Sequence, residues 1–209
     1  IAHEIKNPLT SLIGASELMF AENESSRESK SGDDKLVAII RREGNRVKTL
    51  LDSLFRYTEE LKYSMKIVDI KDVINDVVVL FKIGNSGINI ETDFVSAEVF
   101  GDAERLKEVF WNIFINSAEA MGSKDEIKVK MDKEKGNIKI MIDDSGPGFI
   151  EKNLDRIFDP FFSTKKRGTG LGLAQVYRII ARHGGSVKAE NTQSGARVFI
   201  ELKERQEND

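Results

Sequence analysis

The sequence predicts a helical hairpin followed by an α/β two-layer sandwich, in which helices cover one face of a mixed sheet. Three observations indicate this fold class. The chain has 209 residues, which is long enough for two small domains. Apolar residues recur at helical spacing as far as Lys62, and beyond it short alternating segments are mixed with helices. We therefore predict one domain over residues 1–62 and a second over residues 63–209.

The first domain is predicted to be a pair of amphipathic helices. Apolar residues at three- and four-residue spacing predict a helix from Ala2 to Glu22, and the almost wholly polar residues 23–34 predict a loop. A second helix is expected from Leu36 to Leu61, where the apolar positions come close to a heptad seam. Because a helical hairpin buries only one face of each helix, we expect a homodimer whose two hairpins form a four-helix bundle.

The second domain is predicted to alternate helices with strands. Asp69 and Asp102 are each suitable N-caps for a helix that follows them. A polar turn at Gly136 and Asn137, between two segments of alternating pattern, predicts a β-hairpin. The expected elements, in chain order, are a helix over 70–81, a strand over 88–94, a helix over 102–121, strands over 127–131 and 138–142, a helix over 173–182, and strands around Val187 and over 198–202.

Composition and charge exclude several classes of protein. Apolar residues make up 40% of the chain and charged residues 32%, so it is neither disordered nor fibrous. The near balance of 32 Lys and Arg against 35 Asp and Glu argues against a nucleic-acid partner. The longest unbroken aliphatic or aromatic run, Val77 to Phe81, is far too short for a transmembrane helix, so we expect no membrane contact in this chain. The absence of cysteine excludes disulfides, thiolate zinc sites and cysteine nucleophiles. The two histidines, His3 and His183, are too few for a zinc site built from several imidazoles.

Four clusters of residues indicate chemistry, and the first lies on the helix that begins at Asp102. Glu108, Asn112 and Asn116 follow one another at intervals of four, so they lie within roughly 80° of arc, opposite the apolar face. Amide and carboxylate oxygens are suitable ligands for a Mg²⁺ ion that also bridges phosphates. A solvated polar face is the alternative interpretation.

The second cluster is the Asp-Ser-Gly-Pro-Gly-Phe run at the end of a predicted strand. Asp144 has the same parity as the apolar residues before it, so its carboxylate should point between sheet and helices, where it needs a hydrogen-bond donor. An adenine amino group is one candidate donor, and Gly146 and Gly148 allow a flat ligand to approach the backbone. A plain Asp-Gly turn is the alternative.

The third cluster is a glycine run that opens a helix and comprises Gly168, Thr169, Gly170, Leu171 and Gly172. Such glycines expose backbone N–H groups at the positive end of the helix dipole, where an anion binds. Three cations at residues 165–167 strengthen the case for phosphate, although the pattern is neither a Walker loop nor a dinucleotide-binding motif. Upstream, Phe158, Phe161 and Phe162 either pack a flexible flap onto the domain or belong to its core.

The fourth cluster is His-Glu-Ile-Lys-Asn-Pro near the start of the first helix. His3 is expected to face solvent, opposite the apolar stripe. Beside a carboxylate, such an imidazole can act as a nucleophile, with Glu4 taking the ring proton. Asn7 shares this face and could orient a water molecule or a phosphoryl oxygen. A structural histidine is the alternative, and it is our interpretation of His183, which precedes two glycines at a helix end.

Together and in this order, the motifs resemble those of the bacterial two-component sensor histidine kinases. The match extends from Ala2 to Lys203. It rests on the runs His-Glu-Ile-Lys-Asn-Pro-Leu-Thr, Asn-Ile-Phe-Ile-Asn-Ser-Ala-Glu-Ala, Asp-Ser-Gly-Pro-Gly-Phe, Phe-Asp-Pro-Phe-Phe-Ser-Thr-Lys and Gly-Thr-Gly-Leu-Gly-Leu. The first run and the Phe-Ser-Thr-Lys-Lys run are most similar to the nitrogen-regulation type. The resemblance implies that the sandwich has the fold of histidine kinase and Hsp90-like ATPases.

The resemblance also implies a role for each matching residue. His3 matches the phosphorylated histidine, Glu4 its acid/base partner, and Asn7 a position associated with phosphatase action. Asn112 matches the principal Mg²⁺ ligand, and Glu108 the acidic residue one turn before it. The residues that match the ATP-binding motifs are Asn112, Asn116, Asp144, Gly146, Gly148, Phe161, Thr164, Lys165, Gly168, Thr169, Gly170, Leu171 and Gly172.

The implied enzyme is an ATP-dependent protein-histidine kinase that phosphorylates His3 and passes the phosphoryl group to an aspartate of a response regulator. The segment from Leu61 to Met65 is the expected hinge. The chain departs from the family at Gly195-Ala196, where the family often has Gly-Thr. Three alternatives stay open: a catalytically silent ATP-binding scaffold that docks a regulator, an ATPase that transfers to water, and an enzyme dominated by phosphatase activity.

The start of the chain carries a further expectation. Ile1 is not an initiator Met, no signal peptide is evident, and only two residues of the given sequence precede His3. We therefore expect a cytoplasmic piece of a longer protein that is anchored in a membrane elsewhere in its sequence.

Overall fold

The computed structural model describes residues 8–18, 30–58, 62–121, 126–165 and 168–205. The chain divides into two compact units, Ile1–Glu60 and Leu61–Asp209. Within the described residues, every helix is too short or too polar to serve as a membrane-spanning segment.

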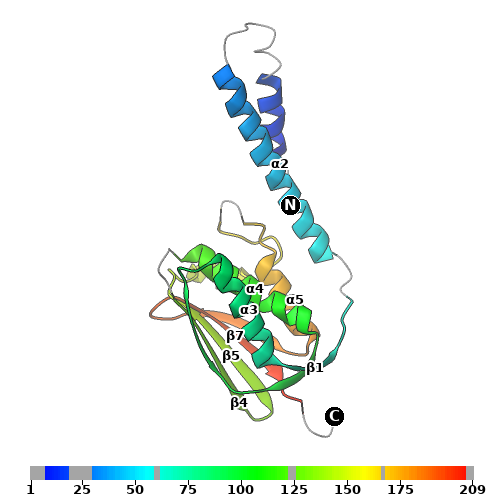
Figure 1. Cartoon of the computed structure of the whole chain (residues 1–209), viewed down its shortest axis with the longest axis vertical. Helices are drawn as coiled ribbons and strands as arrows, with labels where there is room; N and C mark the ends of the chain where they lie inside the picture. Colours follow the sequence, from blue (N-terminus) through cyan, green and yellow to red (C-terminus); the bar gives the residue numbers. More distant parts are fainter. Residues whose placement is uncertain (1–7, 19–29, 59–61, 122–125, 166–167, 206–209) are drawn as a thin grey trace. The chain divides into compact units, whose positions relative to one another are not determined.

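The first unit consists of a helix over residues 8–18 and α2 (Lys30–Thr58), both drawn in blue to cyan in Figure 1. The predicted loop over residues 23–34 is wrong at its end, because α2 already begins at Lys30. Apolar periodicity marks only the packed part of a helix, so a polar first turn leaves no such signal. The predicted seam of α2 is visible as half-buried side chains at Leu36, Ile40, Val47, Leu50 and Leu54.

A five-stranded mixed sheet organises the second unit. The strand order is β2-β4-β5-β7-β6, in which β2 runs parallel to β4 and every other neighbouring pair is antiparallel. A separate antiparallel pair is formed by β1 and β3. The strands are β1 (Lys66–Asp69), β2 (Asn89–Phe94), β3 (Glu98–Gly101), β4 (Glu126–Glu134), β5 (Asn137–Asp144), β6 (Ser186–Asn191) and β7 (Ala196–Lys203).

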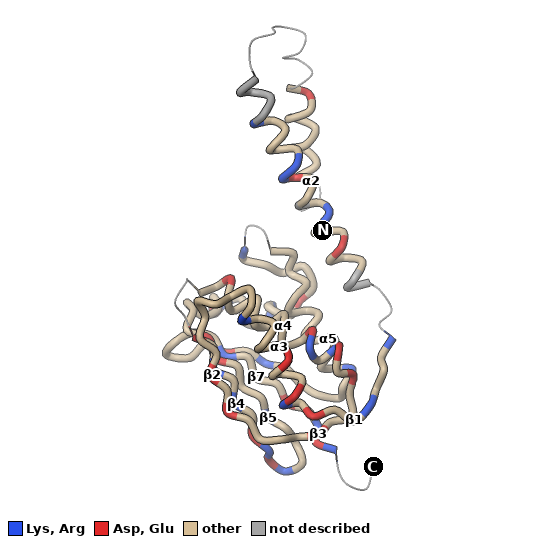
Figure 2. Tube along the Cα trace, viewed as in Figure 1, with Lys and Arg blue, Asp and Glu red and all other residues tan. Residues whose placement is uncertain are grey.

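Three helices pack on one face of this sheet (Figure 1). They are α3 (Ile70–Gly84), α4 (Ala103–Ala120) and α5 (Gly172–Arg182), and a short 3₁₀ helix, η1 (Glu151–Arg156), precedes α5. Every second residue of β5 and β7, and of β4 as far as Met131, is buried beneath the helices, as period-two strands require. The other face is largely polar, and Figure 2 shows residues of both charge signs interspersed along the strands.

The local signals in the sequence account for most of these boundaries. Asp69 caps α3 by accepting from the N–H of Lys71, and Asp102 caps α4 by accepting from that of Arg105, so both predicted N-caps are confirmed. The hairpin turns at Lys135 and Gly136, one residue earlier than predicted, with positive φ at both positions. Two successive positive φ values fit a two-residue turn that follows the twist of the strands.

Candidate functional site

Asp144, the last residue of β5, is buried between the sheet and α4, as its parity predicted. Its Oδ1 accepts hydrogen bonds from the backbone N–H groups of Gly146 at 3.0 Å and Ala196 at 3.2 Å. Its Oδ2 accepts one from the hydroxyl of Ser117, on α4, at 2.9 Å. The protein itself therefore supplies donors that a buried carboxylate requires.

The end of β6 and the turn that follows it hold the loop after Asp144. The side-chain amide of Asn191 accepts from the N–H of Phe149 at 2.6 Å and donates to its carbonyl at 2.8 Å. Gly148, with φ at 77°, leaves the space that Asn191 occupies, since a Cβ atom there would lie 2.8 Å from the Asn191 Oδ1. A Cβ atom on Gly195 would collide with the carbonyl oxygen of Asp144. Loop and turn therefore pack too closely for a side chain at either glycine.

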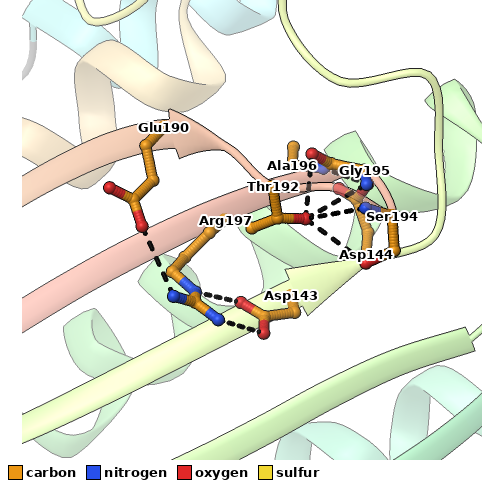
Figure 3. A network of polar contacts seen from close by, with 8 residues as sticks. All are labelled: Asp143, Asp144, Glu190, Thr192, Ser194, Gly195, Ala196 and Arg197. Carbon is orange, nitrogen blue, oxygen red and sulfur yellow. Dashed lines mark hydrogen bonds and ion pairs between the residues drawn. The ribbon is translucent and has the colours of Figure 1, made fainter.

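An ion-pair network braces the same end of the sheet (Figure 3). Asp143 lies opposite Arg197 in the register of β5 and β7, and the guanidinium donates to both carboxylate oxygens, at 2.6 and 2.8 Å. Glu190 accepts a longer bond of 3.4 Å from Arg197. Hydrogen bonding to Asp143 raises the pKa of the Arg197 guanidinium further above its usual value. The bidentate pair fixes the register next to Asp144.

The polar face of α4 points toward the start of α5. The amide oxygen of Asn112 lies 3.6 Å from the position that a Cβ atom on Gly172 would take. Asn116, one turn along, accepts from Lys165 through its side-chain oxygen at 2.8 Å. Glu108, one turn earlier, receives a hydrogen bond from Arg105 at 3.1 Å. The structure thus brings Asn112 to the glycine segment, joins Asn116 to Lys165 and pairs Glu108 with an arginine.

Lys165 links the segment before the glycine run to α4. Its ammonium contacts the Oδ1 of Asn116, the backbone carbonyl of Asn116 at 3.3 Å, and Glu119 at 2.7 Å. The neighbouring Thr164 is exposed. The first of the three predicted cations is therefore held by oxygen atoms of Asn116 and Glu119 on α4.

The glycine segment adopts a conformation that few other residues allow. Gly170 has φ at 65°, accepts a hydrogen bond from the N–H of Phe161, and could not carry a Cβ atom without colliding with the backbone of Phe161. Phe161 itself has φ at 67°, which costs energy for a residue with a side chain. A Cβ atom on Gly168 would collide with the hydroxyl of Ser163. The tight turn presents Gly172 as the first residue of α5.

The N-terminus of α5 carries no side-chain cap among the described residues. Leu171, at the N-cap position, is buried, and its N–H lies 3.4 Å from the hydroxyl of Thr169. Phe158, upstream of the run, packs against Tyr177 on α5, while Arg156 lies over the ring of Phe162. The uncapped helix end therefore stands beside the amide of Asn112.

Several residues at the site escaped the sequence analysis. Ser117 is buried on the apolar side of α4. A serine among otherwise apolar positions of a helix was the sequence feature that could have indicated a buried polar contact. Glu119 lies within a run that resembles the family, but its contact with Lys165 could not be foreseen, and neither could that of Asn191 with Phe149, because the partners are distant in sequence. His3, Glu4 and Asn7 lie outside the described residues. Among those that are described, no three His, Asp or Glu side chains form a metal cluster.

Comparison with known proteins identifies the family. The His Kinase A (phospho-acceptor) domain matches residues 1–60, and the histidine kinase-, DNA gyrase B- and HSP90-like ATPase domain matches residues 101–206. The chain belongs to the bacterial two-component sensor histidine kinases. The predicted fold class of this kinase, a helical region followed by an α/β ATPase sandwich, is confirmed.

Similar proteins match both units of the histidine kinase. It is 31% identical to the sensor histidine kinase ZraS of Escherichia coli over 95% of this chain and 43% of that protein. It is 32% identical to the sensory histidine kinase/phosphatase NtrB of Rhizobium meliloti over 93% of this chain and 54% of that protein. The chain thus spans less than half of ZraS.

A solved structure is similar over nearly the whole kinase chain. The histidine kinase ThkA, crystallised in complex with the response regulator protein TrrA, superposes with a TM-score of 0.76. It is 28% identical, and the match covers 98% of this chain and 60% of ThkA.

Proposed function

We propose that the second unit binds Mg²⁺-ATP and that the γ-phosphoryl group is transferred to His3, then to an aspartate of a response regulator. One observation carries this proposal: α4 contacts a buried carboxylate, that of Asp144, through Ser117, and its Asn112 lies beside the N-terminus of α5, which has no side-chain cap among the described residues. The first suits an adenine and the second suits phosphates, so one nucleotide can engage both. Membership of the kinase family supports the same substrate.

The base end of the proposed site is the carboxylate of Asp144. Two carboxylate oxygens offer about four acceptor directions, and three protein donors use three of them. An adenine amino group is a suitable fourth donor. Gly146 lines this region, where a Cβ atom would press against the Asp144 Oδ1 at 3.0 Å and Met121 at 3.3 Å.

The phosphate end combines the N–H groups at the start of α5, which no described side chain caps, with a cation. Backbone N–H groups at a helix N-terminus attract phosphate oxygens. Residues 168–172 bring the chain into that turn, and Thr164 and Lys165 lead into it. We propose that Lys165 exchanges its oxygen partners on α4 for phosphate oxygens when ATP binds. Positioning and charge neutralisation are the main contributions a protein makes to phosphoryl transfer.

The oxygens available at the site fit a magnesium ion. Mg²⁺ prefers one or two protein oxygens together with phosphates and waters, rather than a cage of protein ligands. Asn112 stands beside the proposed phosphate site, and we propose it as the main ligand, with Glu108 as a secondary one once it leaves Arg105. Bound there, the ion would neutralise phosphate charge.

The chemistry proposed for the first unit rests on His3, Glu4 and Asn7. One ring nitrogen of His3 attacks the γ-phosphorus, the bond to the β,γ-bridging oxygen breaks, and ADP leaves while Glu4 accepts the ring proton. Asn7 is proposed to position water for dephosphorylation of the regulator. The match of residues 1–60 to the phospho-acceptor domain supports this assignment.

Because the nucleotide and His3 belong to different units, transfer requires a domain movement. We propose that the hinge lies N-terminal to Tyr63. The ring of Tyr63 packs edge-on against His183, and the N–H of Ser64 donates to Asp102 at 2.7 Å. Both residues are therefore already bound within the second unit, which shortens the hinge expected at Leu61 to Met65.

The proposed partners are a second copy of the chain and a response regulator. The phospho-acceptor match and the half-buried seam of α2 support the homodimer. The complex formed by ThkA supports the regulator. A cytoplasmic location and a membrane anchor elsewhere in the protein stay predictions of the sequence.

The test is incubation of the protein with γ-³²P ATP and Mg²⁺, followed by transfer to candidate regulators. We expect a covalent label on the wild type that is lost in acid and stable in base, as a phosphoramidate is. The variants Asp144→Asn and Asn112→Ala should take up no label. Steady hydrolysis of ATP without label would indicate an ATPase that transfers to water. Nucleotide binding with neither label nor hydrolysis would indicate a scaffold. Rapid loss of phosphate from an added phosphoregulator would indicate that phosphatase activity dominates.

A further inference from the structure

We propose that Ser117 is a positioning residue that sets the preference of the site for adenine by holding one oxygen of Asp144. The inference rests on the proposed ATP binding and gives a role to a residue that lies within the Asn-Ile-Phe-Ile-Asn-Ser-Ala-Glu-Ala run but was assigned none from the resemblance. Ser117 is 3% exposed and Asp144 is 8% exposed, so their contact is sheltered from water. The distance of 2.9 Å between the Ser117 Oγ and the Asp144 Oδ2 is that of a sound hydrogen bond.

The two oxygens of Asp144 are supported differently. Oδ1 accepts from two backbone N–H groups, those of Gly146 and Ala196, which belong to the main chain of the loop and of β7. In the described part of the chain, Oδ2 has the hydroxyl of Ser117 as its hydrogen-bond partner. Since an oxygen of this kind has two acceptor directions, Oδ2 keeps one for a ligand amino group. Ser117 therefore supports the oxygen that is free to contact the base.

The direction of the hydrogen bond is set by its chemistry. An ionised carboxylate only accepts, so the single proton of the Ser117 hydroxyl points at Asp144. Serine hydroxyls within helices often bond instead to the carbonyl one turn earlier. Because Ser117 follows Asn116 directly, the same helix carries the polar face at the phosphate end and the support for the base end.

Strand β7, which pairs with β5 beside Asp144, offers a position at which a hydroxyl could replace that of Ser117. Asp143 pairs with Arg197 in the register, so Ala196 lies opposite Asp144 and faces the same buried side. The methyl group of Ala196 cannot donate a hydrogen bond, whereas a threonine there could. This chain has Ala196 where the family often has a threonine, and we propose that the Ser117 hydroxyl on α4 supplies the hydrogen bond that such a threonine could donate.

The test measures binding of ATP and of purine riboside triphosphate, which lacks the 6-amino group, to four proteins: wild type, Ser117→Ala, Ala196→Thr and Ser117→Ala/Ala196→Thr. A lost hydrogen bond to a charged group predicts that Ser117→Ala weakens ATP binding about tenfold. Purine riboside triphosphate should bind Ser117→Ala as it binds wild type, within about twofold, because it makes no amino contact with Oδ2. The double variant should recover most of the preference for ATP, and Ala196→Thr alone should resemble wild type.

Each outcome decides between the two hypotheses. If wild type binds no ATP, the proposed function fails. If wild type binds ATP but Ser117→Ala keeps its preference for ATP, or loses affinity for both nucleotides equally, the role of Ser117 is refuted. If Ser117→Ala does not fold, Ser117→Cys carries the same expectation, because a thiol fills a similar volume and is a weaker donor.

Discussion

The Nε2 atom of His183 accepts a hydrogen bond from the backbone N–H of Asp102 at 2.9 Å. The other ring nitrogen lies 2.8 Å from the carbonyl oxygen of Ile179, which assigns the ring proton to Nδ1. Both nitrogens of the imidazole are thereby used, at the junction of α4 and α5. The contacts fit the structural role that the sequence predicted for this histidine, and they leave His3 as the candidate for phosphorylation.

Replacing His183 should destabilise the second unit. His183→Ala leaves the N–H of Asp102 without its partner and removes the edge-on contact with Tyr63, so we expect a loss of about 1–3 kcal/mol in the free energy of unfolding. Urea denaturation measures it. The exposed Gln193→Ala is the control and should change the value by less than about 0.5 kcal/mol. Equal stability of the two variants would refute the structural role.

Stability should fall in acid because of the two N-cap carboxylates. Burial disfavours ionisation of Asp102, but hydrogen bonds from the N–H groups of Ser64, Arg105 and Glu104 outweigh it and lower its pKa. Burial likewise disfavours ionisation of Asp69, but hydrogen bonds from the Ser96 hydroxyl and from the N–H groups of Lys71 and Ala97 outweigh it and lower the pKa. A lowered pKa stabilises the fold above the unfolded value of about 4, and this contribution is lost as the pH falls through the folded value.

The measurement is the free energy of unfolding between about pH 5 and pH 2. We expect the wild-type value to decrease below about pH 4, and Asp102→Asn to show a shallower decrease, because an amide does not titrate. A variant with the same slope as wild type would contradict the assignment to Asp102.

Gly195 should tolerate no side chain, in contrast to Gly84. A Cβ atom on Gly195 would collide with the carbonyl of Asp144, and backbone cannot yield as a side-chain tip can, so Gly195→Ala should cost about 1–3 kcal/mol and weaken ATP binding. Gly84 has no atom within 4 Å of the corresponding position, so Gly84→Ala is the matched control and should be neutral. Thermal melts and nucleotide titrations measure both effects, and a Gly195→Ala protein that matches the control would refute the close packing.

The contact of Lys165 with Glu119 should compete with nucleotide. Exposed ion pairs contribute about 0.2–1 kcal/mol, so Glu119→Gln should tighten ATP binding by no more than about fivefold. Lys165→Ala should weaken it, because the cation proposed for the phosphates is lost. Fluorescence titration with an ATP analogue gives both constants. Weaker binding by Glu119→Gln would mean that Glu119 supports the bound state instead.

Local signals made much of this fold predictable. The caps at Asp69 and Asp102, the strand alternation of β4 and β5, and the helical period of α4 each need only neighbouring residues. The short strands β1 and β3 were not predicted, because four residues are too few for alternation to stand out, and their pairing is a long-range contact.

The site was predictable only where a single residue type carries the chemistry. Asp144 was predicted from its parity and the glycines near it, whereas Ser117 was missed because its partner lies 27 residues away. Lys165 was predicted as a cation, but its contacts with Asn116 and Glu119 depend on how the segment folds back onto α4. Pairings of this kind come from tertiary structure.

Labelling of two histidine variants with γ-³²P ATP tests the central claim most directly. The variants are His3→Gln and His183→Gln, compared with wild type at a temperature where all three are folded and bind ATP. We predict that His3→Gln takes up no label while its affinity for ATP is unchanged, and that His183→Gln is labelled. Label retained on His3→Gln would contradict the account.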